Sequence, residues 1–123
     1  MLPMNPSPED SPDQDLSPLL SERLGMESFK PLLASYVGSF IEQAEKIDLA
    51  LEQANPIDLR TVVHQLKGTG GGYGYPELTR VAAICEQALV EAGPEGTRDK
   101  TVLAALHELR ILMRRARAGL DQG

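Results

Sequence analysis

The chain has one cysteine, no tryptophan and only five aromatic residues among its 123 amino acids. The single cysteine, Cys85, cannot form an internal disulfide, which is consistent with a reducing compartment. No apolar run approaches the roughly 18 to 20 residues that cross a bilayer, and the N-terminus lacks the basic and apolar regions of a secretory signal. We therefore expect a cytoplasmic protein without a membrane span, whose core consists mostly of Leu, Val, Ile and Ala.

Basic charge is also scarce. The net charge is −6, which argues against a general nucleic-acid binder. The charge is unevenly distributed, since residues 1–17 carry four acids and no bases, whereas residues 97–123 carry six bases and three acids. We interpret the basic end mainly as a solvated helix face, and an acidic partner is the alternative.

Hydrophobic periodicity begins only after the first 16 residues. Residues 1–16 are rich in Pro, Ser and Asp, so they are predicted to form a disordered tail. Leucines at helical spacing over 16–24 predict a short N-terminal helix, and four longer helices follow within residues 17–121. Their apolar positions repeat near 3.5 residues and no segment has strand periodicity, which predicts an all-α fold, an antiparallel four-helix bundle.

Cap and turn residues separate the four helices. The first helix is predicted from about residue 28 to 54. Asn55 suits the N-cap of the second helix, which ends before Gly74, a left-handed terminator. The third helix begins at Pro76, and the fourth follows the turn at 93–96. The apolar stripe predicted for the second helix is Leu59, Val62, Leu66, Thr69 and Tyr73.

The stretch HQLKGTGGGYG, residues 64–74, holds five glycines in eleven positions, although a glycine inside a helix costs about 1 kcal/mol relative to alanine. It matches neither the phosphate loop G-x-x-x-x-G-K nor the dinucleotide fingerprint G-x-G-x-x-G, because the required positions hold tyrosines and no Gly-Lys pair exists. His64, His107 and Cys85 follow no zinc spacing, so no metal site is expected.

His64 is predicted to point away from the core. At about 100° per residue, the core positions Val62 and Leu66 each lie about 200° from it. The residues that share its face are two cations and three glycines: Arg60, Lys67, Gly68, Gly71 and Gly72. The three glycines should cost roughly 2 to 3 kcal/mol in helix propensity. Such a cost on an exposed face indicates that a partner approaches the helix closely beside His64.

The two cations indicate that the partner delivers an anion. A neutral imidazole is a nucleophile near physiological pH. A phosphoryl group on its outer nitrogen would add about two negative charges. Arg60 and Lys67 could offset these charges, each by about 0.5 to 1 kcal/mol at an exposed position.

These residues carry a resemblance to a known family. The run His64-x-Leu66-Lys67-Gly68, followed by Gly74 and Leu78, resembles the histidine-containing phosphotransfer (HPt) domain of two-component phosphorelays. The resemblance covers about residues 17–120. It implies that His64 is the phosphoacceptor, which receives a phosphoryl group from a receiver-domain aspartate or a hybrid histidine kinase relay and passes it to another receiver.

The resemblance also implies roles for the neighbours of His64. Lys67 would assist by charge, and Gly68 would give the receiver room, in a docking surface shared with Arg60, Gly71 and Gly72. Where many members have Ser, Ala or Asn, this chain has Thr69, three glycines and Tyr73, so Gln65 and Glu86 are the candidates for orienting the imidazole. The protein would be a monomeric carrier with no cofactor of its own, and Mg²⁺ would be bound by the receiver.

Other functions remain open at this level. One alternative is a helical bundle that binds a receiver without being phosphorylated, although such a module would need no nucleophile. A small hydrolase or kinase is less favoured, because no carboxylate lies within a turn of His64 on its own helix face. His107 lacks the cations and glycines that surround His64, and Cys85 is most simply a small core residue. A fragment of a larger chemotaxis-type kinase would also carry such a module.

Overall fold

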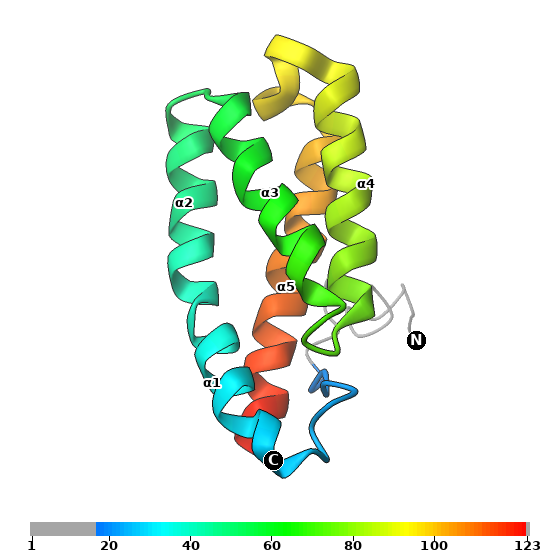
Figure 1. Cartoon of the computed structure of the whole chain (residues 1–123). Coiled ribbons are helices and arrows are strands. Elements are labelled where there is room, and N and C mark those ends of the chain that lie inside the picture. The colour runs from blue at the N-terminus through cyan, green and yellow to red at the C-terminus, as the bar shows by residue number, and fades with distance from the viewer. Residues whose placement is uncertain (1–16, 123) are drawn as a thin grey trace, which may run out of the picture.

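The computed structural model describes residues 17–122, and all regular structure within that range is helical (Figure 1). The predicted all-α four-helix bundle is confirmed. The segment predicted to be a disordered tail lies outside the described residues. Successive long helices run in alternating directions, so each packs antiparallel to the one before it (Figure 1).

Among the described residues the bundle has five α-helices and two short 3₁₀ helices. There are five α-helices and not four because the first predicted helix is divided into two. The elements are, in chain order, η3 (Glu27–Phe29), α1 (Lys30–Gly38), α2 (Phe40–Glu52), α3 (Pro56–Gly70), α4 (Pro76–Ala92), η4 (Gly93–Arg98) and α5 (Lys100–Gln122).

The division at Ser39 corrects the single helix predicted over 28–54. The Ser39 hydroxyl donates to the carbonyl of Tyr36 at 2.6 Å, and the backbone N–H of Ser39 points to the carbonyls of both Ser35 and Tyr36. A serine that bonds back to the preceding turn in this way bends a helix. Gly38, directly before it, removes the side chain that would have favoured a continuous helix.

The short N-terminal helix predicted over 16–24 is absent from the described part of that segment, residues 17–24, and turns occupy 22–25. The backbone there bonds to distant elements instead: the N–H of Leu19 donates to the Arg115 carbonyl, and that of Glu22 to the Gly74 carbonyl, both at 2.8 Å. Leucine spacing alone could not reveal these partners, which lie far away in the sequence.

The turn between α3 and α4 receives this N-terminal segment. Gly74 has φ +86°, which confirms the left-handed terminator. A Cβ on Gly74 would lie 2.3 Å from the Ser21 hydroxyl. That hydroxyl donates to the Tyr73 carbonyl at 2.6 Å, and Arg23 Nε donates to the Gly72 carbonyl at 2.8 Å. The glycine therefore allows two segments to meet that are about 50 residues apart.

The start and the buried face of α3 follow the sequence closely. The Asn55 side chain accepts a hydrogen bond from the Asp58 N–H at 3.0 Å, which confirms the N-cap. The buried face, however, is rotated slightly from the predicted stripe. Thr69 is exposed, where its hydroxyl meets Tyr36 Oη at 2.8 Å. The buried residues of α3 are Leu59, Val62, Val63, Leu66 and Gly70.

The core is mostly aliphatic, as the composition predicts. Cys85 is fully buried within it, and Phe40 and Tyr75 are its only buried aromatic rings in the described range. The aliphatic residues at the centre of the core come from all the long helices: Leu33, Ile47, Leu59, Leu66, Leu78, Val81, Val102, Leu106 and Leu109.

Gly70, at the C-terminal end of α3, allows the helix to pack closely on α4. The sequence does not distinguish Gly70 from the neighbouring glycines. A Cβ on Gly70 would lie 2.9 Å from Thr79 Oγ1 and 3.1 Å from both the Thr79 backbone nitrogen and Leu78 Cβ. The Thr79 hydroxyl donates to the Lys67 carbonyl at 2.9 Å and accepts from the Gly71 N–H at 2.8 Å. Thr79 thus satisfies backbone groups at the end of α3.

Two glycines two residues apart should therefore respond oppositely to alanine. Gly70→Ala is expected to lower the free energy of unfolding by about 1 to 3 kcal/mol, because the added methyl is overpacked against a backbone that cannot move freely. Gly68→Ala meets no atom within 4 Å and should preserve stability or raise it by up to about 1 kcal/mol. Urea unfolding followed by circular dichroism measures both. Equal effects of the two substitutions would contradict this account of the packing.

Candidate functional site

His64 lies on the outer side of α3, with 65% of its side chain exposed. Its helix neighbours Val62, Val63 and Leu66 are buried, so the predicted outward orientation is confirmed. The imidazole and Glu86 line one open hollow of about 410 Å³ on the surface, together with Ile57, Arg60, Thr61 and Gln65. A reacting group from solution can therefore reach the histidine.

Glu86 comes from α4 and anchors the imidazole. Its Oε2 lies 2.8 Å from His64 Nδ1, and its side chain is only 10% exposed. Glu86 follows the fully buried Cys85 on α4, at the border between the core and the surface. An ionised carboxylate can only accept a hydrogen bond, so Nδ1 carries the proton. Nε2 is then the nitrogen with the free lone pair, on the other side of the ring.

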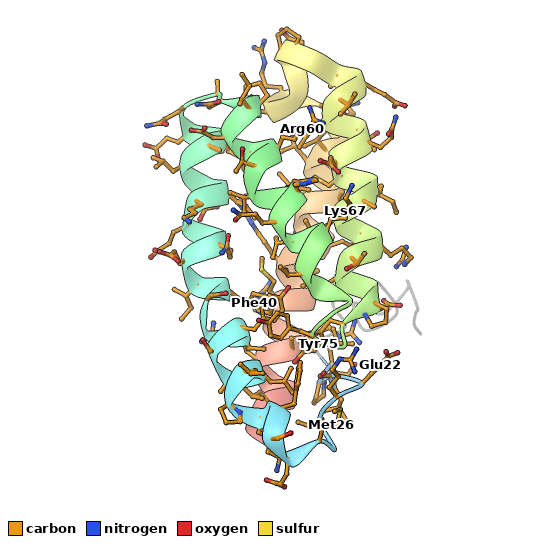
Figure 2. All side chains as sticks on the ribbon, in the orientation of Figure 1. Glu22, Met26, Phe40, Arg60, Lys67 and Tyr75 are labelled. Carbon is orange, nitrogen blue, oxygen red and sulfur yellow. The ribbon has the colours of Figure 1, made fainter. Side chains whose placement is uncertain are left out.

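Three nitrogen-bearing side chains of α3 surround the Glu86 carboxylate. Lys67 Nζ lies 2.5 Å from Oε1, and Arg60 Nε lies 3.5 Å from Oε2, the oxygen that also meets His64. Arg60 and Lys67 both extend from α3 on the side that faces α4 (Figure 2). One carboxylate therefore ties together three successive turns of the neighbouring helix.

This arrangement keeps Glu86 ionised. The hydrogen bond from Lys67, assisted by that from His64 and by both charges, holds the pKa of Glu86 below the ordinary glutamate value. Burial acts in the opposite direction and is outweighed. The site thus contains a negative charge placed directly behind the imidazole, where it favours a protonated Nδ1.

The structure gives the two predicted cations different surroundings. Lys67, expected from the sequence to assist the transferred group by charge, has its ammonium on Glu86 Oε1. Arg60 contacts Glu86 through Nε and also lines the hollow in which His64 is exposed. Of the two, Arg60 is the cation beside the open side of the imidazole.

The predicted docking glycines all lie at the surface. Gly68, Gly71 and Gly72 are exposed, and a Cβ on Gly68 would meet nothing within 4 Å. A Cβ on Gly71 would make only an ordinary contact with Thr79 Oγ1, at 3.6 Å. Their role in docking stays a prediction. The glycines that packing does require, Gly70 and Gly74, are the two buried members of the stretch.

Gln65 and Glu86 were the two candidates for orienting His64, and the structure brings only Glu86 to the ring. Gln65 is exposed and lines the same hollow. Glu86 could be found from the family pattern, but its contact with Lys67 and Arg60 could not, because that contact joins two helices. His107 lies on α5, outside the residues that line the hollow around His64.

Cys85 is not a second nucleophile. It is fully buried, and burial together with the nearby charge of Glu86 raises the pKa of its thiol to about 12. A thiol with such a pKa is unreactive at neutral pH. The interpretation of Cys85 as a core residue is confirmed by its burial.

The sequence does not reveal an aromatic cluster that lies beside the glycine stretch. The rings of Tyr36 and Tyr73 stack with centroids 4.0 Å apart and an interplanar angle of 3°. Phe29 contacts Tyr73 at 5.8 Å, and Tyr36 meets the Thr69 hydroxyl. A helix stripe such as the one predicted to hold Tyr73 does not show which rings stack. The cluster fixes the end of α3 against α1.

Among residues 17–120, no group of three or more His, Cys, Asp or Glu side chains is placed to hold a metal ion. In the same range no helix combines the length and apolar character that a membrane span requires.

Fold and site together define a class of protein: an antiparallel helical bundle with an exposed histidine that is anchored by a carboxylate from the adjacent helix. The family model for the Hpt domain matches residues 31–119, which is most of the chain. The protein belongs to the Hpt domain family. Membership implies participation in phosphotransfer within two-component phosphorelays, as a phosphocarrier module. No curated protein and no solved structure matched the chain.

The lowered pKa of Glu86 has a consequence for stability against pH. Because the folded-state pKa lies below the unfolded value of about 4.3, ionised Glu86 stabilises the fold fully above that value. This stabilisation is lost as the pH falls through the folded-state pKa. Wild type should therefore lose more stability than Glu86→Gln between about pH 5 and pH 3. Urea unfolding of both proteins across this range measures the difference, and parallel curves would contradict the assignment.

Proposed function

We propose that His64 is the phosphoacceptor of this Hpt domain: it takes a phosphoryl group from the aspartate of a receiver domain and passes it to another receiver. The observation that carries the proposal is the 2.8 Å contact between His64 Nδ1 and the buried Glu86 carboxylate. In the neutral ring this contact places the proton on Nδ1 and so leaves the lone pair on Nε2, and His64 lines the open hollow. An exposed nucleophilic nitrogen with a fixed tautomer is what phosphoryl acceptance requires.

The transfer step balances with the groups in place. The Nε2 lone pair attacks the phosphorus of the aspartyl phosphate, an N–P bond forms, and the bond between phosphorus and the carboxyl oxygen breaks. The aspartate leaves with that electron pair as a carboxylate. Nδ1 keeps its proton throughout, so the phosphorylated ring carries a positive charge that Glu86 offsets. The reverse sequence returns the phosphoryl group to an aspartate, which suits a carrier rather than an enzyme that turns over.

Lys67 and Arg60 have different roles in the transfer. Lys67 forms an ion pair with Glu86 and so keeps the carboxylate ionised and oriented. Arg60, at the open side of the ring, offsets the charge on the phosphoryl oxygens. The receiver is expected to supply the acidic pocket and Mg²⁺, which assists by drawing charge from the phosphoryl group. The cytoplasmic location and monomeric state inferred from the sequence stay predictions.

The second candidate function is a bundle that binds receivers without accepting phosphate. His64 and its anchor disfavour it, since binding alone needs neither a nucleophile nor a fixed tautomer. Phosphoryl transfer separates the two functions directly, because only an acceptor gains covalent phosphate.

Phosphorylated receivers should add one phosphoryl group to the wild-type chain, and the product should be labile to acid and stable to alkali. His64→Gln should fold normally and accept none, because its amide is not a nucleophile. Intact-mass measurement after incubation reads out both. ATP with Mg²⁺ alone should leave the wild type unmodified, because neither nucleotide motif is present. Label retained in His64→Gln would place the acceptor elsewhere.

Substitutions at Glu86 should lower the transfer rate by an amount that depends on whether the new side chain can still accept a hydrogen bond. A hydrogen bond to a charged acceptor is worth about 1.5 to 3 kcal/mol, against about 1 kcal/mol for a neutral one. Glu86→Gln can still accept from Nδ1, so transfer should slow by about three- to tenfold. Glu86→Ala removes the acceptor and should slow transfer by about ten- to a hundredfold. Stopped reactions with a phosphorylated receiver give the rates. Wild-type rates in both variants would exclude a role for Glu86 in transfer.

A further inference from the structure

An apolar patch adjoins His64 on the side opposite the glycines. Ile57 is 76% exposed and Val90 is 50% exposed. They line one hollow of about 380 Å³ between the start of α3 and the end of α4, with Pro56, Arg60, Leu89, Gly93 and Pro94. Single exposed apolar residues are common, but two that share a hollow beside a reactive group indicate a binding surface.

This patch is continuous with the site. Ile57 and Arg60 line both this hollow and the hollow that exposes His64. Ile57 precedes His64 by seven residues, two turns along the same face of α3, and Val90 follows Glu86 by four on α4. The two helices are antiparallel, so the apolar pair lies on one side of the His64–Glu86 pair.

The size of a specific interface means that a partner bound at the His64 hollow also covers the adjoining apolar hollow. Seven helical residues span about 10 Å, whereas an interface of standard size covers about 800 Å² on each partner, a disc of about 16 Å radius. A partner centred on His64 must therefore cover Ile57. The other residues that line the hollow around His64 are polar or charged. Ile57, with Val90 beside it, is therefore the residue there that can supply the buried apolar centre such interfaces need.

We propose that Ile57 and Val90 form the apolar anchor onto which the receiver domain docks. This inference rests on the proposed function, and it adds to the predicted docking residues Arg60, Gly68, Gly71 and Gly72 a second contact region on the other side of His64. The occupant is a receiver that presents apolar surface beside its acidic phosphorylation pocket. Arg60, between the apolar pair and His64, faces the acidic edge of that pocket and fixes the orientation of the partner.

Binding without transfer tests the anchor. The probes are isolated receiver domains from the organism that encodes this chain, each activated with beryllofluoride and Mg²⁺, and titration calorimetry measures their Kd for the full chain. With the receiver that binds best, Ile57→Ser should raise Kd by about tenfold and Val90→Ser by several-fold. Ile57 lies in the first turn of α3 and is exposed, so serine there should leave the fold intact by circular dichroism.

A matched control is available in Ile41, which is 51% exposed but lines a different hollow, between α2 and α5. Ile41→Ser should change Kd by less than twofold. Equal effects of Ile57→Ser and Ile41→Ser, or no binding of any receiver to the wild type, would overturn the proposal. So would self-association of the chain that Ile57→Ser abolishes, since the patch would then serve a second copy.

The transfer reaction keeps the two proposals separable. With a phosphorylated receiver, Ile57→Ser should raise the half-saturating concentration about tenfold and leave the maximal rate unchanged, because the hydrogen bond that fixes the imidazole joins His64 to Glu86 and does not involve Ile57. An anchor that fails would show as wild-type binding and saturation in Ile57→Ser while His64 is still labelled. A failed acceptor assignment would show as receiver binding that depends on Ile57 while His64 remains unlabelled.

Discussion

The site depends on one buried carboxylate that the bundle keeps charged. Burial of Glu86 would by itself favour its neutral form, and a neutral carboxyl could donate to the ring and leave the tautomer undefined. Lys67 prevents this with the contact of 2.5 Å on Oε1. The orientation of His64 therefore depends on a lysine that binds the other oxygen of the same carboxylate. Because the carboxylate belongs to α4 and the other groups to α3, the chemistry requires these two helices to keep a fixed register.

The register of α3 on α4 depends in turn on small residues. Gly70 lets the backbone of α3 approach Thr79, and the Thr79 hydroxyl bonds to groups at the end of α3. The glycine stretch thus serves two purposes at once. Its buried members allow the helices to meet, while Gly68 has open space around it. The same run of glycines therefore lets α3 pack closely against α4 and leaves the solvent-facing side of α3 without bulky side chains.

Much of the fold and of the site could be predicted from the sequence, and most of the features that could not be predicted share one cause. The helical pattern gives the bundle, Asn55 gives the start of α3, and the cations and glycines around His64 single it out. These features all depend on residues close together in the chain. The non-helical segment before η3, the packing of Gly70 and the Lys67–Glu86 contact depend on which elements meet. The break at Ser39 is the exception, because its hydrogen bonds are local. Helical periodicity identifies a buried face, but it does not tell Gly70, against α4, from Gly68, in open space.

The contact between Gly74 and Ser21 extends the structural unit beyond the region by which the family is recognised. The family match covers 31–119, whereas Ser21 and Arg23 bond to the carbonyls of Tyr73 and Gly72. A second contact seats Leu19 against Gly119 on α5. These contacts hold the N-terminal segment against the turn after α3 and against α5, at one end of the bundle. The family match and the folding unit thus have different limits. A chain trimmed to residues 31–119 would leave the carbonyls of the turn after α3 without the donors that Ser21, Glu22 and Arg23 supply.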